Sequence, residues 1–388
     1  MGVADIINID KTNMSREEGR AWVEIDLDAL AYNAGKLRSL APPGCELMAV
    51  VKTDAYGMGA VRVAQRLRDE GVKSFAVATV DEGVQLRESG LEGDILVLTY
   101  TRPSRAALLS DYRLAQLIVD KDYAIALDSM GHKLRVHVAL DTGMHREGID
   151  AASLPDIESV FLCDNLTVEG ISTHLASSDS LDAGDMEFTY LQIERYYSAI
   201  ESLVAMGYDV GKLHIQASYG IYNYPDLRCD FIRAGIALCG ALGHDEEMIT
   251  RPELRPVVSV RAVVAQVRWI GAGESVSYGR TFTTEKPIKL ATICIGYADG
   301  VPRHMSGNNG ACIIRGIKSP IVGRVCMDLI MADVSAIEAV APGDVATLIG
   351  ADGGEEIRCE DVARASGTIA NEILSRLGTR LPRVYVSA

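Results

Sequence analysis

The hydrophobic positions between Leu47 and Leu238 follow one repeating pattern, in which a short apolar run precedes a longer segment with helical spacing. Near-continuous apolar runs are typical of strands that are buried on both faces of a parallel sheet. Eight such strands separated by helices predict a (β/α)8 barrel, which is an α/β fold. The predicted strands are 47–51, 75–80, 95–100, 114–119, 134–140, 166–173, 213–218 and 230–238.

The pattern changes after about Pro252, where apolar runs alternate with turns rich in glycine and proline. We expect strands within 257–270, 288–297 and 312–334. One helix is expected over about 361–377, and Gly378 ends it. These elements predict a barrel domain over 20–255 and a mostly β C-terminal domain over 256–388, with residues 1–19 as a polar lead-in.

The composition narrows the class of protein. The 388 residues are 48% hydrophobic and 23% charged, as in globular proteins. The net charge of −15 argues against nucleic acid or an anionic membrane surface as the main partner. No apolar run approaches the ~18 residues of a membrane-spanning helix, and the N-terminus lacks the basic start and apolar segment of a signal peptide. We expect a cytoplasmic protein, either by itself or as the cytosolic domain of a larger membrane-anchored protein.

The cysteines and histidines do not show the spacing of a metal site. The eight cysteines include no C-x-x-C pair, and the seven histidines include no H-E-x-x-H motif. Most of the cysteines lie in apolar runs, where a free thiol behaves as a small hydrophobe. The sequence therefore predicts no metal site and a reducing compartment.

Chemically active residues follow several of the predicted barrel strands, at the end where barrel enzymes have their active sites. Lys52 ends the first strand, just before a glycine-rich turn, and a lysine there is partly desolvated, which lowers its pKa. A neutral lysine amine can bond to an aldehyde, while glycine-flanked backbone and a serine can bind a phosphate. Pyridoxal 5′-phosphate has both groups, but a simple ion pair of Lys52 remains an alternative at this point. The other strand-end residues are Tyr56, Arg146, His174, Ser218, Tyr219, Arg233, Gly235 and Ile236.

The segment "AVVKTDAYGMG" resembles the cofactor-lysine motif of alanine racemases, usually written AVVKADAYGHG. The resemblance continues in the same order along the chain from about Ala21. It is carried by "HVALDTGMHREG", "GISTHLASSD", "RAGIALCG", "SVSYGRTF", "IGYADGVPR" and "GRVCMDLIMADV". Members of this family are homodimers of (β/α)8 barrels with C-terminal β domains, and they use pyridoxal 5′-phosphate (PLP) as cofactor. The resemblance therefore implies a homodimeric PLP-dependent racemase.

The resemblance also implies a role for each matching residue. Lys52 would hold PLP covalently and act as one catalytic base, and Tyr278, from the partner subunit, would act as the opposite base. Arg146, the Met327 backbone and Asn371 would contact the substrate. The remaining residues would bind the cofactor: Tyr56, His174, Ser218, Arg233, Gly235 and Ile236.

Three positions depart from the usual family pattern. Asn371, in "TIANEIL", stands where alanine racemases usually have a tyrosine. The same asparagine is typical of the racemase domain of the membrane-tethered, VanT-type serine/alanine racemases of vancomycin resistance, which this chain resembles. The smaller, polar asparagine leaves room for a hydroxymethyl group, so we expect activity on serine as well as alanine, supplying D-amino acids for peptidoglycan precursors. Ala139 replaces a lysine that is carbamylated in many relatives, so that either a bound anion or another contact must hold Arg146. Met58 replaces a histidine at a position that is expected to be structural.

Four alternatives stay open from the sequence. They are a strict alanine racemase without serine activity, a PLP-binding barrel protein that is not a racemase, a decarboxylase of the same architecture, and a barrel scaffold that is not an enzyme. The C-terminal motifs "SVSYG" and "VCMD" favour the racemase.

Overall fold

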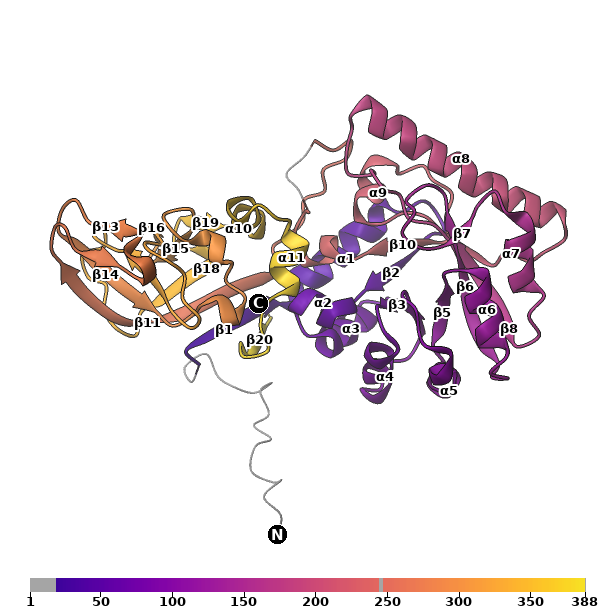
Figure 1. The fold of residues 1–388 in the computed structure, drawn as a ribbon, viewed down its shortest axis with the longest axis horizontal. Coiled ribbons are helices and arrows are strands. Elements are labelled where there is room, and N and C mark those ends of the chain that lie inside the picture. Colours follow the sequence, from indigo (N-terminus) through magenta and orange to yellow (C-terminus); the bar gives the residue numbers. More distant parts are fainter. Residues whose placement is uncertain (1–18, 244–246, 388) are drawn as a thin grey trace, which may run out of the picture.

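The computed structural model describes residues 19–243 and 247–387. A barrel and a β-rich C-terminal domain lie side by side along the long axis of the molecule (Figure 1). The predicted lead-in at 1–19 lies almost wholly outside the described residues.

All eight predicted barrel strands are confirmed. Their order around the sheet is β10-β2-β3-β4-β5-β6-β8-β9, with every pair parallel. The two strands at the ends of this order, β9 and β10, lie next to each other. Two backbone hydrogen bonds join the segments that contain them, from Asp230 N to Leu213 O (2.7 Å) and from Arg233 N to Gln216 O (3.1 Å). The strands are β2 (Glu46–Val50), β3 (Ser74–Val77), β4 (Asp94–Val97), β5 (Ala115–Ile118), β6 (Leu134–Asp141), β8 (Leu166–Ser172), β9 (Lys212–His214) and β10 (Phe231–Ala234), and the short β7 (Ile149–Asp150) pairs with β6.

Side chains alternate between the inside and the outside of the barrel, as the period of two in a strand requires. Met48 and Val50 of β2 belong to the apolar cluster inside the barrel, whereas Leu47 and Ala49 pack into the cluster between strands and helices. In β10, Phe231 belongs to the inner cluster, so Arg233, two residues later, also points inward. The alternation thus fixes which strand residues can reach a site inside the barrel mouth.

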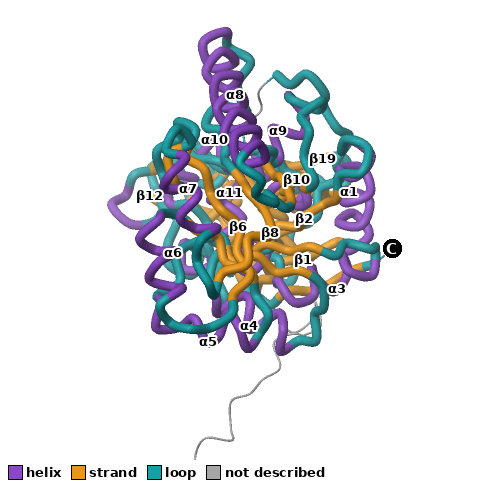
Figure 2. The backbone as a smooth tube through the Cα atoms, turned by 90° about the vertical axis from the view of Figure 1, so that its right-hand side faces the viewer, coloured by secondary structure: helices purple, strands orange, loops and turns teal. Residues whose placement is uncertain are grey.

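Helices surround the strands (Figure 2). They are α1 (Leu27–Leu40), α2 (Lys52–Gly57), α3 (Ala60–Asp69), α4 (Val80–Glu88), α5 (Ala106–Asp111), α6 (Lys121–Asp128), α7 (Leu154–Phe161), α8 (Ala183–Ala205) and α9 (Ser218–Asn223). Side-chain hydrogen bonds cap the N-termini of several of these helices. Asp26 accepts from the backbone of Asp28 and Ala29 at the start of α1, and Thr79 and Glu82 form a capping box at α4.

The C-terminal domain is mostly β, as predicted, and its main sheet has the order β16-β15-β18-β11-β1-β20. Its strands are β11 (Val258–Ile270), β12 (Ser275–Val276), β13 (Phe282–Thr283), β14 (Ile288–Ile293), β15 (Ala311–Ile314), β16 (Ile317–Pro320), β17 (Ile330–Asp333), β18 (Val345–Asp352), β19 (Glu355–Ile357) and β20 (Arg383–Val386). The predicted barrel range of 20–255 needs one correction. Strand β1 (Ala21–Asp26) belongs to this sheet, because it pairs antiparallel with β11 and parallel with β20.

One further prediction of an element was too coarse. The segment 361–377 forms two helices, α10 (Cys359–Ser366) and α11 (Ala370–Ser375), because Gly367 adopts a left-handed conformation (φ 66°) that ends α10. The segment 312–334 forms strands joined by turns, as expected. There are three strands, and the tight turn between β15 and β16 contains Arg315 and Gly316, both with positive φ.

Within residues 19–243 and 247–387, none of the helices combines the length and apolarity that a bilayer crossing requires.

Candidate active site

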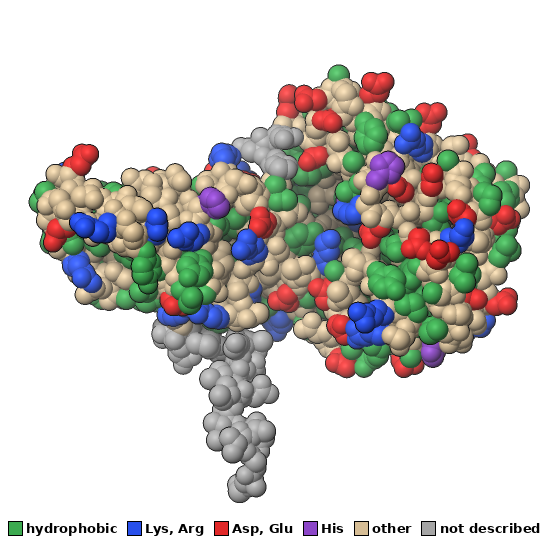
Figure 3. All heavy atoms as spheres, in the orientation of Figure 1, with side chains coloured by type: hydrophobic (Ala, Val, Ile, Leu, Met, Phe, Trp, Pro, Cys, Tyr) green, Lys and Arg blue, Asp and Glu red, His purple; other side chains and the backbone are tan. Residues whose placement is uncertain are grey.

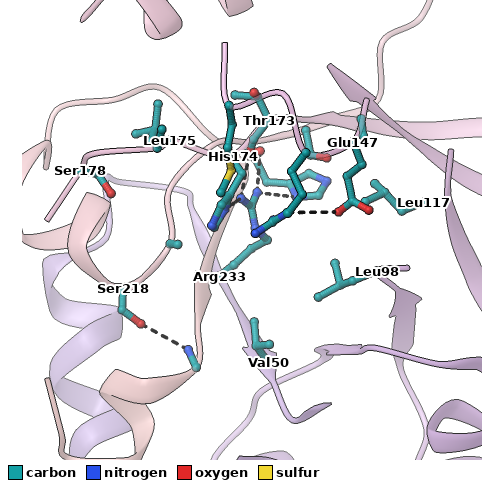
Figure 4. Close-up of a pocket in the computed structure, with 18 of the residues that line it drawn as sticks. Val50, Leu98, Leu117, Glu147, Thr173, His174, Leu175, Ser178, Ser218 and Arg233 are labelled. Atoms are coloured by element: carbon teal, nitrogen blue, oxygen red, sulfur yellow. Dashed lines mark hydrogen bonds and ion pairs between the residues drawn. The ribbon is translucent and has the colours of Figure 1, made fainter. Parts of the chain in front are cut away.

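One cavity of about 600 Å³ opens at the carboxyl ends of the barrel strands. It brings together nine of the eleven site residues predicted from the sequence: Lys52, Tyr56, Arg146, His174, Ser218, Arg233, Gly235, Ile236 and Asn371. The other two, Tyr278 and Met327, do not line it. Figure 4 shows His174, Ser218 and Arg233 around this cavity, with Val50, Leu98 and Leu117 forming an apolar wall.

Lys52 lies where β2 ends and an unusual turn begins. The four residues Thr53 to Tyr56 all have left-handed φ values between 52° and 56°, a conformation that costs roughly 1–2 kcal/mol per non-glycine residue. Such strain persists only where the surroundings enforce it. Here the C-terminal strand β20 supplies part of that support, since Arg383 Nε donates to Gly57 O (2.9 Å) and Tyr385 Oη donates to Met58 O (3.1 Å). The C-terminal domain therefore helps to shape the turn that follows Lys52.

The cavity lowers the pKa of Lys52. Burial is the largest cause, and the positive charge of Arg146 is the next, while the acidic Glu82 and Glu147 act in the opposite direction. A lowered pKa increases the fraction of neutral amine, which is the nucleophilic form.

Arg233 is buried and is held by hydrogen bonds from both of its terminal nitrogens. Nη1 donates to Nδ1 (3.0 Å) and to the carbonyl oxygen (2.7 Å) of His214. Nη2 donates to the carbonyl oxygens of Thr173 (2.8 Å) and Ile215 (3.4 Å) and to His174 Nδ1 (3.4 Å). No described residue accepts a hydrogen bond from Nε, so that the cavity-lining guanidinium keeps one N–H for a ligand.

Burial and the positive charge of Arg233 keep the neighbouring imidazoles neutral. They lower the pKa of His174 to about 3 and that of His214 well below its ordinary value. Burial also lowers the pKa of Arg233 itself, to about 10, so the guanidinium still carries its charge at neutral pH. The centre of the site is therefore one buried cation flanked by two neutral rings.

The backbone of Gly235 lies close to the side chains of Ser218 and Tyr56 in the lining of the cavity. Gly235 N donates to Ser218 Oγ (3.4 Å), and a Cβ atom added to Gly235 would lie only 2.3 Å from Tyr56 Oη. Any larger residue would displace the tyrosine. Ile236 follows at the start of a short 3₁₀ helix, Ile236–Cys239.

These residues fit PLP. Lys52 would supply an amine of lowered pKa for the aldehyde, and Arg233 would offer its free N–H to a ring nitrogen. Ser218 and the glycine-flanked backbone at Gly235 supply hydroxyl and N–H groups of the kind that bind phosphate.

The side of the cavity that contains Arg146 is less tightly fixed. The side chain of Arg146 is 56% exposed, and its nearest acidic partner is Glu147, at 3.9 Å between Nε and Oε1. Ala139 is buried beside the apolar wall and has no polar group with which to hold Arg146. Asn371 lies near Tyr219, since the Cβ position of Gly243 is 3.3 Å from Asn371 Oδ1 and 3.5 Å from Tyr219 Oη.

Tyr278 and Met327 lie on the surface of the C-terminal domain, 70% and 52% exposed. They share one patch, because Ser277, beside Tyr278, bonds to Arg324 O (2.8 Å), three residues before Met327. Tyr278 begins the turn between β12 and β13, and β13 lies at the end of the domain that is remote from the barrel (Figure 1). The two residues therefore cannot complete the cavity of their own chain.

Sequence reasoning missed His214 and Glu147 as site residues. His214 lies on a predicted strand, and its only signal was an ionisable side chain in an otherwise apolar run, "LHIQAS". Glu147 directly follows the predicted Arg146, but nothing in the sequence shows that its charge reaches Lys52.

The chain is similar to known proteins along nearly its whole length. Residues 25–243 match the family described as alanine racemase, N-terminal domain, and residues 257–385 match alanine racemase, C-terminal domain. An alanine racemase of Carboxydothermus hydrogenoformans is 39% identical over 369 residues, which cover 94% of this chain and 99% of that protein. An amino-acid racemase of Enterococcus faecalis is 39% identical over 372 residues, which cover 96% of this chain but 52% of that protein. This chain thus spans about half the length of that relative.

Solved structures show the same fold. The alanine racemase from E. faecalis superimposes with a TM-score of 0.87 at 31% identity, covering 95% of this chain and 98% of that chain. The alanine racemase from Bartonella henselae, solved with covalently bound pyridoxal phosphate, superimposes with a TM-score of 0.84 at 30% identity. That superposition covers 95% of this chain and 100% of the other.

Proposed function

The chain belongs to the alanine racemase family, whose members depend on PLP, and from this premise we propose that it interconverts the L and D forms of alanine and serine. One observation carries the proposal: nine predicted site residues line a single barrel cavity, and the other two share one exposed patch. A racemase needs a proton-transfer group on each face of the substrate α-carbon. Lys52 in the cavity can supply one of these groups, and Tyr278 on the exposed patch can supply the other.

Bound PLP withdraws electrons from the α-carbon of an attached amino acid and so lowers the barrier to removing its proton. Lys52, besides holding the cofactor, exchanges the α-proton on one face, and Tyr278 of the partner subunit exchanges it on the other. Arg146 binds the substrate carboxylate as a cation. Arg233 would donate its Nε–H towards the cofactor ring without giving up its proton, because a guanidinium stays charged at working pH.

We propose a homodimer in which the Tyr278 patch covers the barrel mouth of the partner. Four large apolar residues are exposed on the C-terminal domain in this region or next to it: Tyr278, Tyr297, Met327 and Leu329. Exposed groups of this kind mark interfaces. The acidic excess lies almost wholly in residues 19–256, and Figure 3 shows acidic side chains over the barrel and more basic ones over the C-terminal domain. Contact between the two domains of different subunits therefore avoids bringing two acidic surfaces together.

Serine activity rests on Asn371. Its carboxamide lines the cavity and has no hydrogen-bond partner among the described residues, so it can donate to, and accept from, a substrate hydroxyl. We propose that the chain provides D-alanine and D-serine for peptidoglycan precursors, as in vancomycin resistance, and acts in the cytoplasm, either by itself or as the cytosolic part of a longer protein.

The experiment that tests this function follows the optical activity of L-alanine and L-serine by circular dichroism after adding the purified protein with PLP. Decay to zero with both amino acids supports the proposal. Decay with alanine alone identifies a strict alanine racemase. No decay with either amino acid, despite a bound cofactor absorbing near 420 nm, identifies a PLP-binding barrel that is not a racemase of these amino acids.

A further inference from the structure

Two cysteines meet at the end of the barrel opposite to the cavity. Cys45 directly precedes β2, and Cys229 lies two residues before β10, the neighbouring strand. Their Sγ atoms are 3.2 Å apart. All eight cysteines lie in the described residues, and this is the only sulfur–sulfur contact among them.

The backbone at this place suits a covalent bond between the two sulfur atoms. Glu46 pairs with Phe231 across the parallel ladder, and Glu46 N donates to Asp230 O (2.8 Å). Cys45 therefore lies opposite Asp230, one residue from Cys229. With neighbouring strands ~4.8 Å apart and a rise of ~3.3 Å per residue, this offset gives a Cα–Cα distance of about 6 Å, which is near the most common distance for disulfides.

We propose that Cys45 and Cys229 form an oxidative modification site, a dithiol that a hydroperoxide converts into a disulfide between the neighbouring strands β2 and β10. The Cys45 thiolate attacks the peroxide O–O bond, which breaks to leave a sulfenic acid on Cys45 and to release water or an alcohol. The Cys229 sulfur then attacks the Cys45 sulfur, so that an S–S bond forms, the S–O bond breaks and a second water leaves. The two thiols together lose two electrons and two protons, and the peroxide gains them.

The surroundings assign different roles to the two sulfurs. The contact between the two sulfur atoms lowers the pKa of Cys45, while the same contact and burial raise the pKa of Cys229. Cys45 is therefore the thiol that ionises first, and the thiolate is the form that attacks a peroxide. Both residues are only partly buried, so a small peroxide can reach them.

Other cysteines of the chain lack this arrangement. Cys163 is also partly buried, but its Sγ donates to a backbone oxygen, Ser159 O, at 3.4 Å. Burial and nearby acidic groups raise its pKa. It therefore has neither the lowered pKa nor a second sulfur, which makes it a matched control.

The test treats the PLP-loaded protein with one equivalent of hydrogen peroxide, blocks the remaining thiols with N-ethylmaleimide and maps non-reduced tryptic peptides by mass spectrometry. Cleavage after Arg38, Lys52, Arg228 and Arg233 isolates the two cysteines on peptides 39–52 and 229–233. We expect these peptides joined by a bond that dithiothreitol cleaves, and a fall in free thiols from eight to six. Cys163→Ser should keep the link, and Cys45→Ser and Cys229→Ser should each lose it.

The wild-type result decides the proposal even if a variant does not fold. Peroxide treatment that leaves eight thiols, joins Cys45 to a different cysteine, or carries Cys45 to sulfinic acid without a link to Cys229 overturns it. A loss of two free thiols from Cys229→Ser under the same treatment would also overturn it, because the disulfide would then not involve Cys229.

Discussion

Arg233 donates to both the ring nitrogen and the carbonyl oxygen of His214, at 3.0 and 2.7 Å, inside the closed end of the cavity. Because His214 Nδ1 accepts this bond, its Nε2 carries the hydrogen and donates to His137 Nδ1 at 2.9 Å. Burial lowers the pKa of His137 to about 4, so both rings stay neutral. A chain of three side chains therefore fixes how the guanidinium faces the cavity.

Replacing this cation by a carboxylic acid should change the fidelity of the reaction. Arg233→Glu can share a proton with the cofactor ring, which makes the ring a stronger electron sink and lets the proton return to the wrong carbon. We expect racemisation of alanine to fall by about 100-fold, the range seen when one stabilising donor is lost, while pyruvate release rises. A coupled lactate dehydrogenase assay measures the pyruvate, and Arg233→Lys, which keeps the charge, serves as control. An unchanged ratio of pyruvate to D-alanine in Arg233→Glu contradicts this role.

The pH dependence of cofactor binding should report the environment of Lys52. The rate at which PLP rebinds to the apo protein depends on neutral amine, so it should level off at a pH below the ordinary lysine pKa. Arg146→Ala removes a positive neighbour that lowers this pKa, so the midpoint should move to higher pH. Glu147→Gln removes a negative neighbour that raises it, so the midpoint should move to lower pH. Shifts in the same direction in both variants would refute the assignment.

A single methyl group at Gly235 should weaken cofactor binding. Its Cβ would lie 2.3 Å from Tyr56 Oη and 2.9 Å from Cζ, so the buried tyrosine must move. We expect Gly235→Ala to raise the Kd for PLP at least about 10-fold, measured by absorbance titration of the apo protein. Gly184→Ala is the matched control, because nothing lies within 4 Å of the added methyl group. Equal affinities in the two variants would show that the close approach is unimportant.

Asn371→Tyr should separate the two proposed substrates. The larger side chain fills space beside Tyr219 and removes the carboxamide, so kcat/KM for serine should fall about 10-fold or more relative to alanine, the cost of a lost polar contact of about 1.4 kcal/mol. Racemisation rates for both amino acids give the ratio. If the ratio does not change, Asn371 does not select serine.

The barrel could be predicted because its signal is local. Each strand is a short apolar run, and a parallel sheet covered by helices makes all eight runs look alike. Strand β1 was not predicted as part of the C-terminal sheet, because its partners are far away in sequence: Ala21 pairs with Ala262, and Val23 with Arg383. Such pairing leaves no local signal.

The same difference between local and long-range signals decides which features of the candidate site could be predicted. Lys52 could be placed at the barrel mouth because it directly follows a predicted strand, and Arg233 because it lies on the eighth predicted strand. The left-handed turn after Lys52 could not be predicted, because Thr53 and Ala55 have no preference for positive φ, and distant residues such as Arg383 help to enforce it. The hydrogen bond between Arg233 and His214 likewise depends on the inward registers of two strands.

The central claim is that Lys52 and Tyr278 act together only across a subunit interface, and a defined heterodimer tests it most directly. Co-expression with two affinity tags gives a dimer of one Lys52→Ala chain and one Tyr278→Phe chain, which contains one site with both residues intact if the tyrosine comes from the partner. The control pairs a wild-type chain with a Lys52→Ala/Tyr278→Phe chain, in which every site then lacks one residue.

The measurement is alanine racemisation by these two purified heterodimers. The account predicts about half of the wild-type activity for the first heterodimer and almost none for the control. The reverse result, with the control active and the first heterodimer inactive, would place both residues in one chain's own site and contradict the account.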